Sequence, residues 1–308
     1  MLSLRLQIAL AFLSIYTIWG STYLAIRFAI ETFPPFLMAA IRFLIAGGVL
    51  YAWMRLRGAQ RPTRANWKAA LIIGGLLLLG GNGGVTKAEQ VIPSGLTAVL
   101  ITIVPIWMAL VELLQKDRVV PTLQTVLGLV LGFGGVVLLV GPGGLASSGG
   151  LNPLWVGVLL FASLSWATGS VYSRKASLPK TPLLGSGMEM LAGGVLLLFA
   201  SLVSQEWIGF QPSNVSFLSL VSFLYLIVFG SLIAFSSYVW LLTKTTTARA
   251  STYAYVNPVV AVFLGYFLAG EQLTLRTLLA SSMIVIAVVV ITTYKSRHSR
   301  SETDRLES

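Results

Sequence analysis

The sequence predicts an all-α membrane protein of ten transmembrane helices, built as two inverted five-helix repeats. Of its 308 residues, 56% are hydrophobic and only 10% are charged, whereas soluble domains carry about 25% charged residues. The first 20-residue run without charge, Gln7 to Ile26, is long enough to cross about 30 Å of hydrocarbon as a helix. Many similar runs follow, and the two halves of the chain share sequence features.

The apolar runs define ten expected spans joined by short loops. The first run is too long for a signal peptide and lacks a small-residue cleavage site, so we expect a retained helix. The glycine-rich stretch from Gly141 to Gly150 is typical of a turn and separates two five-helix units, residues 1–145 and 151–294. Residues 295–308 form a polar tail that we expect to be disordered and cytoplasmic. The expected spans are residues 7–28, 34–54, 69–87, 94–114, 123–140, 154–173, 184–203, 217–241, 248–268 and 275–294.

Basic residues are distributed unevenly between the two sides of this arrangement. The side that holds both termini carries 17 of the 21 Lys and Arg residues, and the other side carries only Lys87 and Arg276. Because Lys and Arg are retained in cytoplasmic loops, both termini are expected in the cytoplasm, which requires an even number of spans. The net charge of +11 is therefore a topology signal, and nucleic acid is not an expected partner.

The two halves repeat short motifs at similar spacing. Trp19-Gly20-Ser21, followed by Arg27, is echoed 147 residues later around Trp166 and Arg174. Because five spans is an odd number, the second copy must enter the membrane upside down. Inverted repeats of this kind provide two packings of similar energy, which is the physical basis of alternating access.

Two prolines fall at matching places in the halves, Pro105 and Pro258. A proline inside a helix removes one hydrogen bond and frees a carbonyl. In hydrocarbon the freed carbonyl needs protein or a wet cavity around it, so both prolines predict helix breaks beside a binding site.

Aromatic and amide side chains within the spans are the first candidates for a substrate cavity. Trp and Tyr also form belts at membrane surfaces, and Tyr23 is close enough to a span end for this alternative. Asn82 lies between two pairs of glycines, which indicates either a close ligand approach or tight helix packing. The candidate substrate-binding residues of this kind are Trp19, Tyr23, Asn82, Trp107, Trp166, Ser170, Tyr253 and Asn257.

Ionisable residues inside spans are functional candidates by default. Arg42 lies two turns into the second span, where it could hold a substrate carboxylate or pair with Glu89. Glu189 lies in the seventh span, where it could pair with Lys175 or Lys180, or carry a proton for coupled transport.

The fifth span carries Gly128 and Gly132, a small-residue surface that indicates helix packing, with a homodimer face as the alternative. The sequence lacks the residues that ATP binding, metal binding and catalysis require. No P-loop is present, and the single histidine, His298, lies in the tail. No Ser/His/Asp or paired-carboxylate arrangement occurs within the predicted spans. We therefore expect no enzyme activity, no cofactor and no metal site; zero cysteines exclude thiol chemistry.

Taken together, these residues resemble the EamA-type permeases of the drug/metabolite transporter superfamily over nearly the whole chain, from about residue 7 to residue 293. The first repeat departs from the pattern, because Asp117-Arg118 stands where the second has Gly270-Glu271. The segments that carry the resemblance are Trp19 to Arg27, Arg42-Phe43, Ile92 to Leu96, Tyr253 to Pro258, and Gly270-Glu271.

The resemblance implies a bacterial inner-membrane exporter of amino acids or other small metabolites. It also implies a central cavity among the first, third, fourth, sixth, eighth and ninth spans. A lipid-linked-sugar flippase and a non-transporting membrane scaffold are the alternatives. The first needs a basic headgroup site, for which Arg27 and Arg42 are the candidates, and the second would usually have longer soluble loops.

Overall fold

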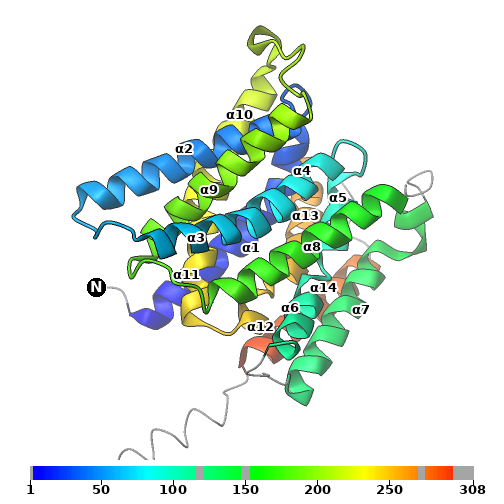
Figure 1. Ribbon diagram of the computed structural model, residues 1–308. Helices are drawn as coiled ribbons and strands as arrows, with labels where there is room; N and C mark the ends of the chain where they lie inside the picture. Colours follow the sequence, from blue (N-terminus) through cyan, green and yellow to red (C-terminus); the bar gives the residue numbers. More distant parts are fainter. Residues whose placement is uncertain (1–2, 116–120, 147–152, 270–274, 294–308) are drawn as a thin grey trace, which may run out of the picture.

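The computed structural model describes residues 3–115, 121–146, 153–269 and 275–293, in which helices are joined by turns and loops and no strand occurs (Figure 1). Several helices begin where the sequence offers a start signal. Pro35 and Pro182 occupy first-turn positions, where a missing N–H costs nothing, and the hydroxyls of Ser3 and Thr63 accept from the exposed N–H groups. The helices are α1 (Leu4–Ala29), α2 (Pro35–Leu56), α3 (Arg64–Gly74), η1 (Gly75–Gly83), α4 (Gly84–Ala88), α5 (Ser94–Ile101), α6 (Val104–Leu113), α7 (Leu123–Ala146), α8 (Pro153–Ser173), α9 (Pro182–Val203), η2 (Pro212–Asn214), α10 (Phe217–Tyr225), η3 (Leu226–Phe235), α11 (Ser236–Lys244), α12 (Thr247–Ala250), α13 (Tyr253–Ala269) and α14 (Leu275–Thr293).

The prediction of an all-helical, multi-pass membrane protein is confirmed. Within the described residues, six helices are long and apolar enough to cross a membrane: Leu4–Ala29, Pro35–Leu56, Arg64–Ala88, Pro153–Ser173, Pro182–Val203 and Phe217–Lys244. The four other expected spans correspond to the α5–α6 pair, α7, the α12–α13 pair and α14. These helices are shorter, interrupted, or run up to residues outside the described part.

The fourth and ninth spans are both divided into a short and a longer helix. The first division lies at Thr102–Ile103, and Pro105 then occupies the first turn of α6. The second lies at Ser251–Thr252, between α12 and α13. At Pro258 the structure differs from the prediction, because this proline lies inside the continuous helix α13. The helix has one hydrogen bond fewer there but retains its direction.

The turn expected from Gly141 begins later than predicted. Helix α7 continues through Gly141 and Pro142 as far as Ala146, because proline and glycine both accept helical dihedral angles and the proline removes only one hydrogen bond. Residues 147–150 of the predicted turn and the tail 295–308 lie outside the described residues.

Helices α2 and α9 lie against each other along much of their length (Figure 1). Their backbones meet at Gly47 and Gly187: a Cβ on Gly47 would stand 2.8 Å from the carbonyl oxygen of Gly187. Only glycine permits so close an approach, so this contact fixes how a helix of the first half crosses one of the second.

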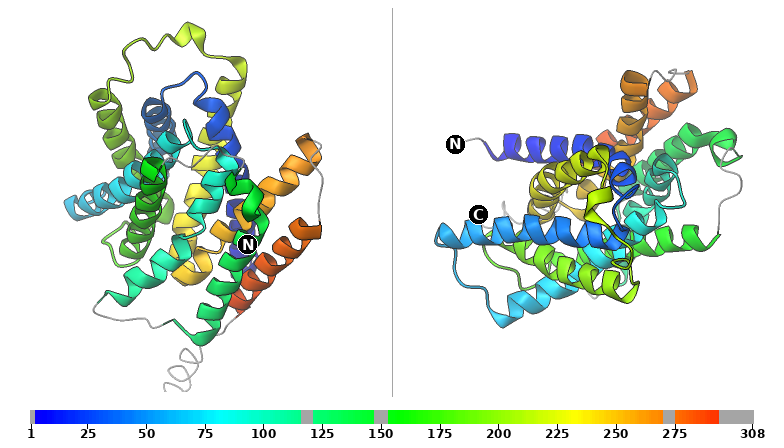
Figure 2. Two further views of the ribbon diagram at one scale, coloured as in Figure 1. Left: turned by 90° about the vertical axis from the view of Figure 1, so that its right-hand side faces the viewer. Right: turned by 90° about the horizontal axis from the view of Figure 1, so that it is seen from above.

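Helices α7 and α14 pack side by side at one edge of the molecule, as both views in Figure 2 show. Gly128 of α7 lies against Ile291 of α14, so the small-residue surface of the fifth span contacts the tenth span. The homodimer expected at this surface stays a prediction.

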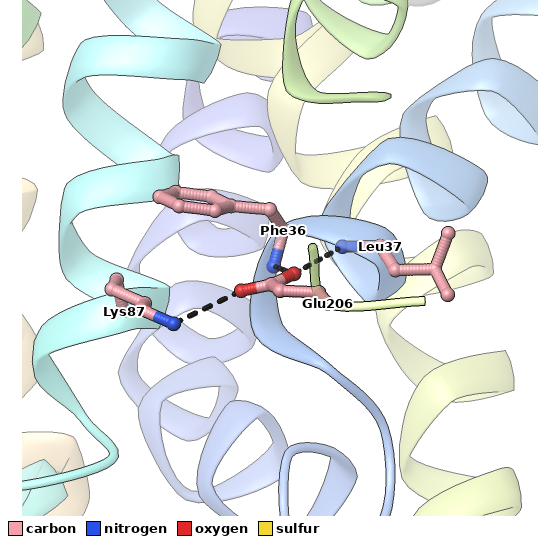
Figure 3. A network of polar contacts seen from close by, with 4 residues as sticks. All are labelled: Phe36, Leu37, Lys87 and Glu206. Carbon is pink, nitrogen blue, oxygen red and sulfur yellow. Dashed lines mark hydrogen bonds and ion pairs between the residues drawn. The ribbon is translucent and has the colours of Figure 1, made fainter. Parts of the chain in front are cut away.

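At one end of the bundle, the carboxylate of Glu206 contacts two other helices (Figure 3). Glu206, in the turn after α9, pairs with Lys87 of α4 at 3.0 Å. Its other oxygen accepts hydrogen bonds from the backbone N–H groups of Phe36 (2.9 Å) and Leu37 (3.1 Å) at the start of α2. A negative charge at a helix N-terminus is stabilising, so Glu206 connects three helices.

The third and eighth spans share two features. Each contains a π-helical segment, η1 in the first half and η3 in the second. An arginine reaches the carbonyl end of each: Arg27 Nη1 donates to the carbonyl oxygen of Glu89 at 2.6 Å. Arg174 Nη1 donates to the carbonyl oxygens of Leu242, at 3.0 Å, and of Thr245. Spans three and eight therefore end in the same way.

Candidate functional site: a central cavity

A cavity lined by residues of both halves of the chain lies inside the bundle. Seven of the residues predicted to bind substrate line it together: Trp19, Tyr23, Arg42, Asn82, Trp166, Tyr253 and Asn257. Their role in binding stays a prediction. The other lining residues are Thr22, Ile26, Phe43, Leu78, Gly81, Val85, Ile101, Val104, Ala162, Ser163, Gly230 and Phe235.

Four aromatic rings, which we call the aromatic cluster, pack together beside the cavity: Trp19, Trp166 and Tyr253, which line it, and Tyr238, which packs on all three. Trp19 lies between the other three, with ring centroids 4.8 Å from Tyr253, 5.1 Å from Tyr238 and 5.5 Å from Trp166. The edge-to-face contacts with Trp166 and Tyr253 are favourable for aromatic rings. The cluster joins α1 of the first half to α8, α11 and α13 of the second.

Hydrogen bonds hold the cluster in place. The Tyr238 hydroxyl lies 2.6 Å from Ser170 Oγ and accepts from Trp166 Nε1 at 3.2 Å. Trp19 Nε1 donates to the carbonyl oxygen of Gly230 at 3.3 Å. Buried Trp and Tyr need such partners for their polar atoms, so the rings have fixed positions around the cavity.

Arg42 is a cation inside the apolar bundle. Its side chain is 3% exposed; Nε donates to Ser231 Oγ at 2.7 Å, and the guanidinium carbon lies 4.7 Å from the ring centre of Phe43. Nη1 has no hydrogen-bond partner among the described residues. A Cβ on Gly230 would come within 2.8 Å of Nη2, so glycine at this position leaves the space that the guanidinium occupies.

Asn257 brings an amide to the cavity lining. It is 1% exposed, and neither its Oδ1 nor its Nδ2 has a hydrogen-bond partner in the part of the chain that the structure describes. Asn82, in η1, accepts a hydrogen bond from Thr86 through its backbone carbonyl at 2.8 Å. The cavity therefore combines aromatic surface, one cation and buried amide atoms, which can bind a small solute that has both apolar and polar parts.

Two predicted residues lie one layer outside the lining. Trp107 Nε1 donates to Ser163 Oγ at 3.1 Å, and Ser170 bonds Tyr238. Tyr238 and Ser231 were missed by the sequence analysis. The only signal for Tyr238 was a polar aromatic residue within the charge-free eighth span, and a serine such as Ser231 is too common in a helix to be singled out.

The buried acids do not form the ion pairs considered from the sequence. Lys87 and Glu206 form an ion pair, with 3.0 Å between Nζ and Oε1. Neither carboxylate of Glu89 or Glu189 has a hydrogen-bond partner among the described residues, so the Arg42–Glu89 pair and the salt bridge of Glu189 with Lys175 or Lys180 are absent. Glu189 lies where α9 packs on Gly74 of α3 and does not line the cavity. Its proton-carrying role stays a prediction. The described residues include no group of three His, Cys, Asp or Glu side chains that could hold a metal.

Known proteins resemble this chain over almost its whole length. The EamA-like transporter family matches residues 6–141 and, a second time, residues 153–293. The "Uncharacterized inner membrane transporter YedA" of Escherichia coli (strain K12) is 42% identical over 285 residues, which cover 92% of this chain and 89% of that protein. The "Uncharacterized transporter YoaV" of Bacillus subtilis (strain 168) is 25% identical over 299 residues, covering 94% and 98%.

A solved crystal structure has the same fold, with a TM-score of 0.72 at 21% sequence identity; the match covers 93% of this chain and 97% of that one. The two family matches, the inner membrane relative and the apolar helices agree. The chain belongs to the EamA-like transporter family and is a multi-pass transporter of the bacterial inner membrane.

Proposed function

We propose that the protein is a secondary transporter that exports small metabolites, such as amino acids or related compounds, through the central cavity. The observation that carries this proposal is the buried Arg42, whose Nη1 has no hydrogen-bond partner among the described residues, in the same cavity as the buried amide of Asn257. Buried polar atoms normally have partners, so these atoms are available to a solute. A carboxylate suits the guanidinium, and the amide can both donate and accept.

The mechanism we propose is alternating access between two inverted five-helix repeats. Its support is the correspondence between the halves: π-helical segments in spans three and eight, arginines at the ends of both, and divided helices in spans four and nine. Two equivalent sets of contacts can exchange at little net free energy. The export direction, with both termini in the cytoplasm, rests on the family resemblance and on the distribution of Lys and Arg.

Counterflow in vesicles containing the purified protein tests the function. Vesicles loaded with one unlabelled solute should accumulate the same solute in labelled form, using amino acids, purines, sugars and aromatic acids in turn. Asn257→Ala and Trp19→Ala should reduce the exchange of the solute that is found, while the protein stays folded.

Matched controls are Asn214→Ala and Trp53→Ala, because both side chains are exposed and lie far from the cavity lining. If both cavity variants exchanged at the wild-type rate, the cavity would not be the transport site. A protein that exchanged none of the solutes would contradict the proposed function. Sidedness is measured separately, by protease cleavage of a tag on the tail in right-side-out vesicles.

A further inference from the structure

Glu89 is a buried acid that the proposed function does not yet use. It follows α4 directly, is 0% exposed, and neither of its carboxylate oxygens has a hydrogen-bond partner within the described chain. An ionised carboxylate in such a place is unfavourable because it has lost its water. Burial raises the pKa of Glu89 well above its usual range, against the opposing effect of the positive charge of Arg27. Burial therefore favours the protonated carboxyl group over the carboxylate.

The end of the helix does not require an acid at this position. Arg27 bonds the backbone carbonyl of Glu89, which any residue would supply. The second half shows the same arrangement without an acid, because Arg174 bonds the carbonyls of Leu242 and Thr245. The hydrogen bond from Arg27 at the end of α4 therefore does not explain why this residue has a carboxyl side chain.

Glu89 is connected to the cavity through α1. Tyr23, which lines the cavity, lies one helical turn before Arg27, and Glu89 is within electrostatic reach of both. A movement of α1 against α4 would therefore change the surroundings of the carboxyl group and of the cavity wall together.

The helices that pack against α4 offer no other free charged side chain near Glu89 among the described contacts. Lys87 is paired with Glu206, and Arg42 of α2 donates to Ser231. Segment η1 has no ionisable side chain, and α8 has only Tyr172. Among these contacts, Arg27 is therefore the cation that can move its hydrogen bond from the backbone carbonyl of Glu89 to the carboxylate of the same residue.

We propose that Glu89 binds the proton that couples solute export to the pH difference across the membrane. The inference rests on the proposed function. One proton enters from water on the outer side, is held on Glu89 while α1 and α4 are closed as in this structure, and leaves to water on the cytoplasmic side. Arg27 then stabilises the ionised carboxylate until solute has moved outward. The exchange is one proton in for one solute out.

Glu189 is the matched comparison. It is likewise 0% exposed, and its two carboxylate oxygens have no partner among the described residues. Neither acid lines the cavity, but Glu189 lies in the packed contact of α9 with Gly74, whereas Glu89 is within electrostatic reach of Arg27 and of the cavity residue Tyr23. Replacing either acid by glutamine removes one buried carboxyl group from the bundle. Only the change at position 89 should uncouple transport from protons.

The experiment compares two measurements in vesicles, for the amino acid, purine, sugar or aromatic acid with the highest wild-type counterflow. Counterflow is measured at equal pH on both sides, and net accumulation is measured with a difference of one pH unit. Coupling to one proton permits up to about tenfold accumulation for each pH unit. Glu89→Gln should retain counterflow and lose the pH-driven accumulation. Glu89→Asp, which keeps a carboxyl group, should retain part of it. Glu189→Gln and the exposed control Glu31→Gln should retain both activities.

Other results overturn the proposal. Wild-type counterflow that a pH difference cannot drive would leave transport standing and remove proton coupling. Coupling that survives in Glu89→Gln and disappears in Glu189→Gln would assign the proton to Glu189. If Glu89→Gln does not fold, the other variants decide. Full coupling in Glu89→Asp with loss of coupling in Glu189→Gln would also assign the proton to Glu189. A partial loss of coupling in Glu89→Asp alone would support Glu89 as the proton-binding residue.

Discussion

Arg42 Nε donates a hydrogen bond of 2.7 Å to Ser231 Oγ, and this bond joins α2 of the first half to the π-helical segment η3 of the second. It fixes the guanidinium beside the cavity while leaving Nη1 without a partner among the described residues. The bond therefore fixes the position of this cation beside the cavity without neutralising its charge.

Arg42→Gln should weaken solute binding. Hydrogen bonds to charged groups contribute about 1.5–3 kcal/mol, so the apparent affinity in counterflow should fall by about 10- to 100-fold. Arg42→Lys keeps the charge but loses the planar donors, and its loss should be smaller. Arg57→Gln is the control, since Arg57 lies over the exposed Trp53 ring. Equal affinities for all three variants would contradict a role of Arg42 in binding.

Tyr238→Phe should loosen the aromatic cluster. The change removes the hydroxyl that contacts Ser170 and Trp166 and should lower the free energy of unfolding by about 1 kcal/mol. Ser170→Ala should cost a similar amount, and the double variant should cost less than the sum, because both break the same bond. Thermal unfolding in detergent gives these values, with Tyr172→Phe on the surface of α8 as the control. Additive costs would show that the bond contributes nothing.

Gly47→Ala should destabilise the crossing of α2 and α9. The new Cβ would meet the Gly187 carbonyl oxygen at 2.8 Å, and overpacking of this kind costs about 1–3 kcal/mol. The neighbouring Gly48 is a matched control, because a Cβ there has no atom within 4 Å. Gly48→Ala should leave stability unchanged or raise it by up to about 1 kcal/mol through helix propensity. Unfolding temperatures of the two variants, measured in the same detergent, test this prediction. Equal unfolding temperatures would show that the close approach at Gly47 contributes nothing to stability.

Glu206→Ala should destabilise the protein more than Lys87→Ala. The glutamate both pairs with Lys87 and accepts two backbone N–H groups of α2, whereas the lysine loses only a partly exposed ion pair, worth under about 1 kcal/mol. For Glu206→Ala we expect about 1–2 kcal/mol more, from the lost helix cap. High salt should reduce the Lys87 effect. Equal losses would show that the cap is without consequence.

The stability of the protein should fall as the pH rises above the ordinary pKa of a glutamate. The pKa of Glu89 is raised in the folded state, so the unfolded chain loses this proton first and the folded chain keeps it. Folding then binds a proton, and each pH unit within this window reduces the free energy of unfolding by up to about 1.4 kcal/mol. Glu89→Gln should flatten the fall in unfolding temperature measured from pH 5 upward. An unchanged slope would show that Glu89 does not hold a proton in the folded state.

Much of this fold follows from local properties of the sequence. The length of each apolar run and the position of each cap determine where helices begin and end. The cavity residues were predictable for a related reason, because polar and charged groups inside an apolar span face the interior of the bundle or a cavity and not lipid. Trp19, Arg42 and Asn257 all line the cavity.

Other features depend on how helices are rotated against one another. A π-helical segment contains an extra residue in its turn, so the 3.6-residue period could not place Ser231 against Arg42 or Tyr238 against Trp19. Glu189 has the same burial as Glu89, and the sequence could not show that its part of α9 packs on Gly74 of α3. A proline pattern also cannot distinguish an interrupted helix, as before Pro105, from a continuous one, as at Pro258.

The contact between Trp19 and Trp166 gives the protein an internal optical probe. The two indoles lie 5.5 Å apart at 80°, and chromophores held this close share their excited states. Their paired band in the ultraviolet circular dichroism spectrum should weaken whenever α1 separates from α8. The opening and closing of the transporter can thus be followed without a dye and before its solute is identified.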